Sequence, residues 1–124
     1  MTAFKAIREA LLPITTKYKW PLEPNMYDGT ENYYITYNYA DNRGGDFGDD
    51  SPLCNVADIQ DHFFMPQKDK AKKLNFIPYM EEIRRALYQN DFTYPVVRPI
   101  SNTDADRQMD VWHIVFECEY EETI

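Results

Sequence analysis

The stretch that decides the fold is "DVWHIVFECEYEE", residues 110–122, in which apolar and polar residues alternate. Five residues share the apolar face of this stretch: Trp112, Ile114, Phe116, Cys118 and Tyr120. A period of two is typical of a β-strand with one face on a hydrophobic core and the other facing solvent. The sequence therefore predicts a half-buried strand near the C-terminus.

Three further stretches are predicted to be strands. "NYYITYNYA" (32–40) places its apolar residues on the face of Ile35 and Tyr37, with Thr36 and Asn38 opposite. "VADIQDHFFMP" (56–66) alternates in the same way, although Asp61 interrupts its apolar side. "TYPVVRPI" (93–100) pairs with the closing strand. The pattern indicates a sheet with an apolar and a polar face.

Two stretches have a helical period instead. In "TAFKAIREALLP" (2–13), Thr2 is a candidate N-cap, and the helix is expected to end at Pro13. In "NFIPYMEEIRRALYQND" (75–91), Asn75 is the candidate N-cap and Pro78 fits the first turn. The prolines between residues 13 and 24 predict an irregular segment at the edge of the sheet.

The expected order of elements is helix, edge segment, strand, strand, helix, strand, strand, with no internal repeat. A length of 124 residues suits one domain spanning residues 1–124. We expect an α+β fold in which an antiparallel sheet of four to five strands is packed with two helices.

Charge and composition exclude several classes of protein. The formal net charge is −8 and the sequence pI is about 4.6, which argues against tight binding of nucleic acid, because that binding needs Lys and Arg to displace counterions. No apolar run reaches the roughly 20 residues that span a bilayer, so we expect no membrane contact and a protein made in the cytoplasm. Ten tyrosines suit either strands or interfaces.

The segment "DNRGGDFGDDSPL" (41–53) is rich in Asp and Gly and invites a calcium-binding interpretation. Read from Asp41 or from Asp46, it lacks the oxygen donors and the glycine that an EF-hand loop requires. We therefore expect a flexible, solvated loop and no metal site. A weak cation site at Asp46, Asp49 and Asp50 is the alternative.

No catalytic constellation emerges from the sequence. Asp58 and His62 share one face of a predicted strand, but about 13 Å separates residues four apart on a strand, too far to share a proton or a metal. His113 could face His62 across the sheet, although exposed polar positions explain both. There is no nucleophile elbow, P-loop or G-x-G-x-x-G motif and no paired-cysteine motif. We expect no enzymatic activity and no cofactor.

One basic cluster stands out in this acidic chain. "QKDKAKKLN" (67–75) carries Lys68, Lys70, Lys72 and Lys73. Such a run is usually a solvated surface, but it could also contact an acidic surface on a neighbouring copy, because complementary patches favour head-to-tail association.

Five phrases of the sequence carry a resemblance that spans nearly the whole chain: "IREALLPI" (7–14), "YITYNYADNRGGDFGDDSPL" (34–53), "IQDHFFMP" (59–66), "EEIRRALYQNDFTYP" (81–95) and "HIVFECEYEE" (113–122). Together they resemble the tail completion or tail terminator proteins, which join head to tail in long-tailed bacteriophages and prophages. The resemblance implies a sheet packed with helices and a ring, normally a homo-hexamer, that caps the tail tube and meets the head connector.

The resemblance gives the unexplained segments a possible role. It implies a structural virion protein at the tail-head junction, whose partners are its own copies, the tube protein and the connector or stopper protein. DNA would pass through the ring without specific binding, which the acidic balance suits. Residues of 41–53, 67–75 and 101–109 would contact neighbours or line the lumen: Asp46, Phe47, Asp49, Asp50, Lys68, Lys70, Asp104, Asp106 and Arg107.

Two alternatives stay open from the sequence. The first is another neck or connector subunit of the same particle. The second belongs to a different class, a small hydrolase or metal-binding domain that uses Asp58, His62 or the aspartates of 41–53.

Overall fold

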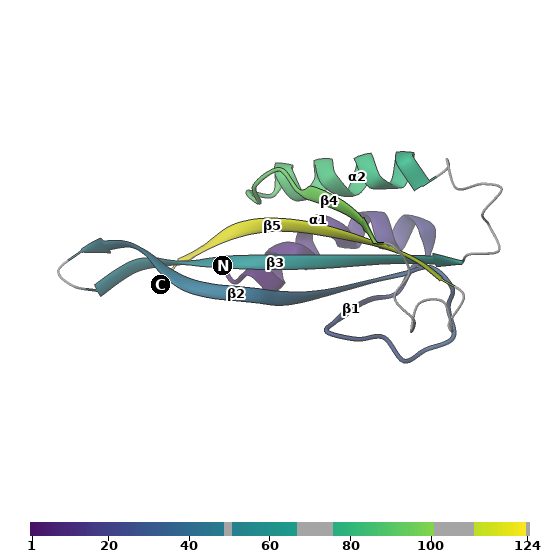
Figure 1. The fold of residues 1–124 in the computed structure, drawn as a ribbon, viewed down its shortest axis with the longest axis horizontal. Helices are drawn as coiled ribbons and strands as arrows, with labels where there is room; N and C mark the ends of the chain where they lie inside the picture. The colour runs from purple at the N-terminus through teal and green to yellow at the C-terminus, as the bar shows by residue number, and fades with distance from the viewer. Residues whose placement is uncertain (49–50, 67–75, 101–110, 124) are drawn as a thin grey trace.

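The computed structural model describes residues 1–48, 51–66, 76–100 and 111–123, and near the gaps it describes the backbone alone. The elements follow the predicted order: α1 (Ala3–Tyr18), β1 (Leu22–Pro24), β2 (Tyr34–Gly48), β3 (Ser51–Pro66), α2 (Phe76–Gln89), β4 (Val96–Ile100) and β5 (Val111–Thr123). Figure 1 shows an elongated α+β molecule in which the β2–β3 hairpin projects past the helices at one end. The predicted fold class is confirmed.

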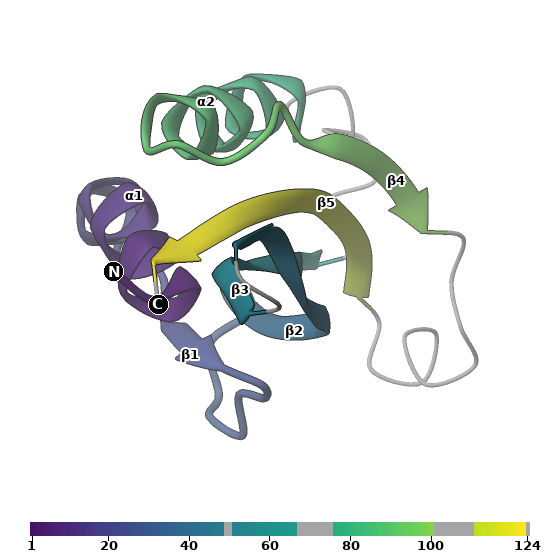
Figure 2. The same ribbon diagram turned by 90° about the vertical axis from the view of Figure 1, so that its left-hand side faces the viewer.

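The five strands form one sheet in the order β1-β2-β3-β5-β4. The pairs β2–β3, β3–β5 and β5–β4 are antiparallel, whereas β1 pairs in parallel with β2. The sheet is therefore mixed, which corrects the expectation of a purely antiparallel one. The short, proline-ended β1 lies at its edge, as the prolines predicted. Both helices lie on the same side of the curved sheet, and the two termini lie side by side (Figure 2).

The hydrophobic core lies between this side of the sheet and the helices. The alternation of β5 is confirmed from Ile114 to Tyr120, because Ile114, Phe116, Cys118 and Tyr120 are all buried, although Val115 of the opposite face is buried as well. The side chain of Trp112, the fifth residue of the predicted apolar face, lies outside the described part. Helix α1 contributes Ile7 and Leu11, and α2 contributes Ile83 and Leu87. Burying one such side chain contributes about 1.5–3 kcal/mol. Among the described residues, no helix covers the opposite side of the sheet, and we call it the helix-free face.

Helix α1 does not end at Pro13, which corrects the prediction. Pro13 lies inside the helix, and its exposed ring replaces the one N–H that would bond the carbonyl of Glu9. Beyond it, Ile14 and Thr15 are buried against the core, so tertiary packing outweighs the local cost of proline. The helix ends instead at Tyr18, and Lys19, whose backbone is left-handed (φ 61°), caps it.

The segment 41–53 is not a flexible loop in its described part. Residues 41–48 extend β2 and residues 51–53 begin β3, with Gly45 opposite Cys54 and Phe47 opposite Pro52. A Cβ at Gly45 would lie 3.0 Å from Cγ2 of Val56, so the close approach of the two strands explains a glycine that composition alone assigned to a loop.

A bulge between Tyr39 and Asp41 changes which residues face the helices. Before the bulge Tyr39 packs toward the core, and after it Asn42 does so, while Asp41 and Arg43 lie opposite Asp58 and Val56 on the helix-free face. One inserted residue reverses the side on which each later side chain projects. The bulge therefore places the charges of the hairpin base on the helix-free face.

Candidate assembly surface

A groove of about 560 Å³ crosses the helix-free face near the base of the hairpin. It runs from the bulge of β2, across β3 and β5, to the segment that leads into β4. Its walls include the polar side chains of Asp58, Gln60, Glu117 and Glu119, together with Tyr94 and the apolar Val96. The acidic residues alternate with buried Ile59 and Cys118, so the same strand period that builds the core also builds the groove.

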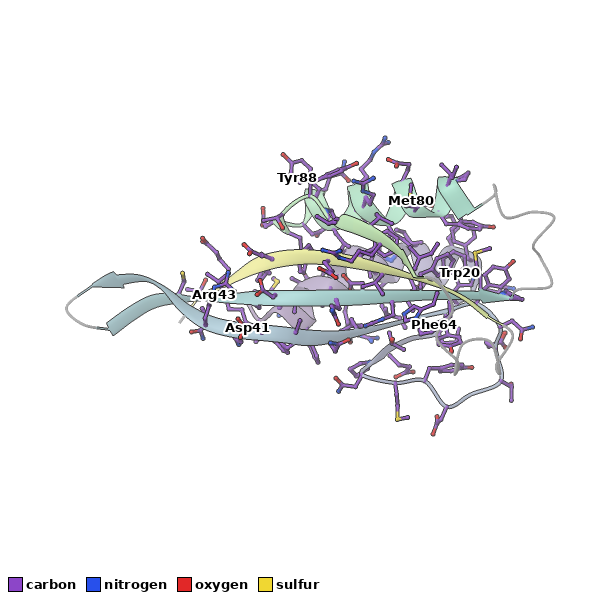
Figure 3. All side chains as sticks on the ribbon, in the orientation of Figure 1. Trp20, Asp41, Arg43, Phe64, Met80 and Tyr88 are labelled. Atoms are coloured by element: carbon purple, nitrogen blue, oxygen red, sulfur yellow. The ribbon has the colours of Figure 1, made fainter. Side chains whose placement is uncertain are left out.

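Arg43 lies near Asp41 at the base of the hairpin (Figure 3) and pairs with Asp58 and Glu119, which line one end of the groove. Its Nη1 lies 2.7 Å from Oδ2 of Asp58 and 3.5 Å from Oδ2 of Asp41, and its Nη2 lies 3.2 Å from Oε1 of Glu119. The Asp58 carboxylate, followed by that of Glu119, raises the pKa of Arg43. The cluster joins β2, β3 and β5 at the base of the hairpin.

The groove keeps an excess of negative charge despite its ion pairs. Arg98 Nε lies 2.9 Å from Oε1 of Glu117, so two guanidinium groups face the carboxylates of Asp41, Asp58, Glu117 and Glu119. Of these carboxylates, three line the groove itself, those of Asp58, Glu117 and Glu119, so against two guanidinium groups its walls keep a surplus of one negative charge. Because these side chains are partly exposed, they also attract mobile cations and basic protein segments.

The rim of the groove presents exposed apolar surface. Tyr94 and Val96 are 49% and 55% exposed, and Tyr88 at the end of α2 is 59% exposed and contacts the Tyr94 ring edge-on at 5.6 Å. The guanidinium of Arg84 lies 4.4 Å from the centre of the Tyr94 ring, and its Nε donates to the Pro95 carbonyl at 3.2 Å. Tyrosine and arginine held in this way are typical of protein interfaces.

A band of rings covers the other end of the helix-free face. His62 Nδ1 lies 2.7 Å from His113 Nε2, and His62 Nε2 lies 2.8 Å from Asn38 Oδ1. His113 stacks on Phe64 at 4.3 Å and Phe64 on Tyr34 at 4.5 Å. The histidines thus meet across the sheet rather than standing as separate exposed residues, and buried Tyr34 shows that this face of β2 is not uniformly polar.

Asp61, which interrupts the apolar side of the stretch 56–66, is a charged residue type on the buried face of β3. The side chain is fully buried in the core, and its Oδ1 has no hydrogen-bond partner. The Cys118 thiol donates to Oδ2 at 3.8 Å. Burial raises the pKa of Asp61 to about 8, so the carboxyl group is mainly protonated at neutral pH. Burial, and the nearby Asp61, likewise raise the pKa of Cys118, which disfavours a reactive thiolate.

Most of the contact residues implied by the resemblance lie outside the described residues. The backbone of Asp46 and Phe47 belongs to β2, but their side chains are outside the described part. The other seven are outside the described residues altogether: Asp49, Asp50, Lys68, Lys70, Asp104, Asp106 and Arg107. Those predictions stay predictions. Sequence reasoning did not identify the groove, although the alternation of 110–122 already placed Glu117 and Glu119 on one face.

The described residues offer neither a metal-binding cluster nor a membrane span. Within them, no group of three or more His, Cys, Asp or Glu side chains is placed to hold a metal ion. None of the helices in the described ranges has the length and apolar character needed to cross a bilayer.

Comparisons with known proteins add no relative to these observations. The sequence matches none of the known protein families against which it was scanned, and no curated protein matches it either.

Proposed function

We propose that this chain is a structural subunit that caps the tail tube of a long-tailed bacteriophage as a ring, six-membered as in the tail terminators it resembles. In this role it stops tube growth and joins the tube to the head connector. It acts through protein contacts, without catalysis, cofactor or metal, and it resides in the virion at the tail-head junction.

The observation that carries the proposal is the distribution of the resembling phrases over the fold. The phrases of 7–14 and 113–122 lie on α1 and β5, and that of 34–53 covers β2 and the start of β3. Those of 59–66 and 81–95 lie on β3 and on α2 with the segment leading to β4. A resemblance that includes residues of both the helices and the sheet supports the proposal more strongly than one short motif would. The α+β architecture is also of the kind that the resemblance implies.

The electrostatics of the chain are compatible with a DNA conduit. With a formal net charge of −8, a ring of such subunits repels phosphates on average. DNA would then slide through a lumen that offers it few places to bind. The proposed partners are therefore other copies, the tube protein and the connector, and the DNA is a passing cargo.

Negative-stain electron microscopy tests the proposal directly. The protein is mixed with the tail tube protein of the same phage, and tube lengths and tube ends are compared with tube protein alone and with tube protein plus an unrelated acidic protein. We expect tubes of limited length with a ring at one end. Unchanged tubes, with circular dichroism confirming a folded protein, would contradict the terminator role and favour a connector subunit.

A separate titration addresses the metal-binding alternative. A cation that binds only the native state must raise the melting temperature. We expect calcium and zinc to leave it unchanged, whereas a clear increase would favour a metal-dependent domain over an assembly subunit.

A further inference from the structure

We infer that the groove on the helix-free face receives a second copy of this chain, through the exposed side of that copy's helix α1. The inference rests on the proposed function, because a ring requires a contact between two different surfaces of the same subunit. One surface is the groove. The other is a row of side chains on α1, Lys5, Arg8 and Leu12, which we call the basic stripe.

The groove has an acidic side and an apolar side. Asp58, Glu117 and Glu119 form the acidic side, which keeps a surplus of one negative charge after its ion pairs with two arginines. Tyr94 and Val96, which are 49% and 55% exposed, form the apolar side. Because a guanidinium and a neighbouring ring already hold Tyr94 in place, docking there immobilises few additional side-chain rotamers. The groove therefore suits a rigid partner surface that is both basic and apolar.

The basic stripe of α1 has this chemistry. Lys5, Arg8 and Leu12 follow one another at three and four residues, so they lie along one side of the helix. All three side chains are exposed, Leu12 by 44%. Among the described residues, no carboxylate lies within 4 Å of the Lys5 or Arg8 cation. Glu9, the acidic residue of α1, instead lines a separate cavity between α1 and α2. The stripe thus offers two positive charges and an apolar side chain to an acidic and apolar groove.

The two surfaces lie at opposite edges of the sheet. Arg8 Nη1 donates to the Leu22 carbonyl of β1 at 3.2 Å, so the basic stripe borders the β1 edge. The apolar side of the groove lies at β4, which forms the other edge. Figure 2 shows α1 and β1 on one side of the molecule and β4 on the other. The sheet therefore separates the stripe from the groove of its own chain, whereas a head-to-tail contact between copies joins them and can close into a ring.

The spacing of the basic stripe matches the spacing across the groove. Lys5 and Leu12 are seven residues apart, about 10 Å along the helix axis. Asp58 on β3 and Val96 on β4 are two strand spacings apart, also about 10 Å, because β5 lies between them. A helix laid across the strands with Leu12 on Val96 brings Lys5 to Asp58. Arg8 then lies over the carboxylates of β5, in the mode of a helix bound in a groove.

Sedimentation velocity at 50 and 500 mM NaCl, over a range of protein concentrations, tests the inference without the tube protein. We expect wild-type protein to associate at low salt and to dissociate at high salt, because salt screens the contact. Glu119→Lys and Lys5→Glu should each raise the dissociation constant of self-association about tenfold. An equimolar mixture of the two variants should associate again, because each keeps the surface that is altered in the other. Exposed Glu31→Lys and Arg85→Glu make the same charge changes elsewhere and should have no comparable effect.

A disulfide trap gives a second readout. Leu12→Cys and Val96→Cys place one thiol on each proposed surface, and the native Cys54 and Cys118 are buried. We expect an oxidised mixture of the two single variants to form a cross-linked heterodimer. Met26→Cys, at a position that is 72% exposed and outside the basic stripe, replaces Leu12→Cys in the control mixture. A trap that forms no faster than this control would contradict the inference.

Other outcomes would overturn the inference by identifying a different occupant or none. Wild-type protein that is monomeric at every salt and concentration has no such contact. Loss of association in Glu119→Lys without loss in Lys5→Glu would mean that another part of the second copy occupies the groove. Loss of tube-protein binding in Glu119→Lys, with self-association unchanged, would make the tube protein the occupant.

The two proposals can fail separately. If Glu119→Lys and Lys5→Glu abolish self-association but tubes are still capped as by wild type, the groove is not the ring contact, and the inference fails while the terminator role stands. If self-association follows the expected pattern but tubes are never capped, the terminator role fails and the contact between copies stands.

Discussion

At the scale of single residues, Asp61 makes stability depend on pH. Its pKa is raised to about 8 in the fold, so between pH 4 and pH 8 the unfolded chain releases a proton that the folded chain retains. The stabilisation is fully present below the unfolded pKa and is lost as pH rises through the folded pKa. We predict that Asp61→Asn, measured by urea unfolding, becomes more stable relative to wild type by about 1.4 kcal/mol per pH unit in this window.

Asp58→Asn provides the control for this prediction. Asp58 lies on the same strand, but its side chain is partly exposed and paired with Arg43. Replacing it should not reproduce the gain with rising pH. Parallel stability curves for wild type and Asp61→Asn between pH 4 and pH 8 would show that Asp61 is not held protonated in the core.

The buried carboxylate of Glu122 accepts hydrogen bonds on both of its oxygens. Its oxygens accept from the Ala3 N–H at 2.8 Å, the Tyr39 hydroxyl at 2.5 Å and Asn42 Nδ2 at 3.1 Å. Burial alone would raise the pKa of Glu122, but these hydrogen bonds outweigh it, and the pKa is lowered. The contribution of Glu122 to stability is therefore present above the unfolded pKa and is lost as pH falls.

We predict that Glu122→Gln lowers the free energy of unfolding at pH 7 by about 1–3 kcal/mol, because a neutral amide accepts these bonds less well and buries an unneeded donor. The deficit should shrink as the pH is lowered from 7 towards 3, because protonation of the wild-type carboxylate removes the same charge. Urea unfolding at both pH values measures it, with exposed Glu121→Gln as the matched control. A deficit as large at pH 3 as at pH 7 would mean that packing, not charge, makes Glu122 matter.

At the scale of elements, Pro13 destabilises α1 locally, because it lies inside the helix. We predict that Pro13→Ala raises the free energy of unfolding by roughly 1–3 kcal/mol, because it restores a donor to the Glu9 carbonyl and improves helix propensity. Thermal and urea unfolding measure the gain. Thr16→Ala, also exposed and in the same helix, should change stability by less than about 1 kcal/mol. A loss of stability in Pro13→Ala would indicate that the proline ring has a packing role.

The elements that the sequence predicted well are those whose local pattern and tertiary packing agree. The alternation of β5 and the helical period of Ile83 and Leu87 both match the buried residues. The misjudged elements are those where long-range pairing overrides composition. Residues 41–48 contain two adjacent glycines and read as a loop, yet pairing with β3 and the ion pairs of Arg43 hold them in a strand.

At the scale of the whole molecule, the groove could not be predicted because it depends on register. Asp58 and Glu119 are far apart in sequence and become neighbours only through β3–β5 pairing. Arg43 joins them only because the bulge moves it to the helix-free face. The contact of His62 with His113 depends on the same pairing. The alternation of apolar and polar residues identifies the two faces of each strand. To predict a site that spans four strands, the register of each strand pair must also be known.

The last prediction concerns the projecting hairpin and its aspartates. Replacing Asp46, Asp49 and Asp50 together with Asn removes three of the negative charges of this acidic chain. We expect the free energy of unfolding to change by less than about 0.5 kcal/mol per substitution, because aspartate side chains are mostly exposed in proteins and substitutions at exposed positions usually have small effects. Capping of tail tubes should change, because on the proposed function these residues meet a neighbour or line the lumen. Asp28→Asn, an exposed aspartate outside the hairpin, controls for charge loss alone. If the triple variant unfolds, the aspartates stabilise the hairpin itself. If it folds and caps tubes as wild type does, the hairpin aspartates play no part in assembly.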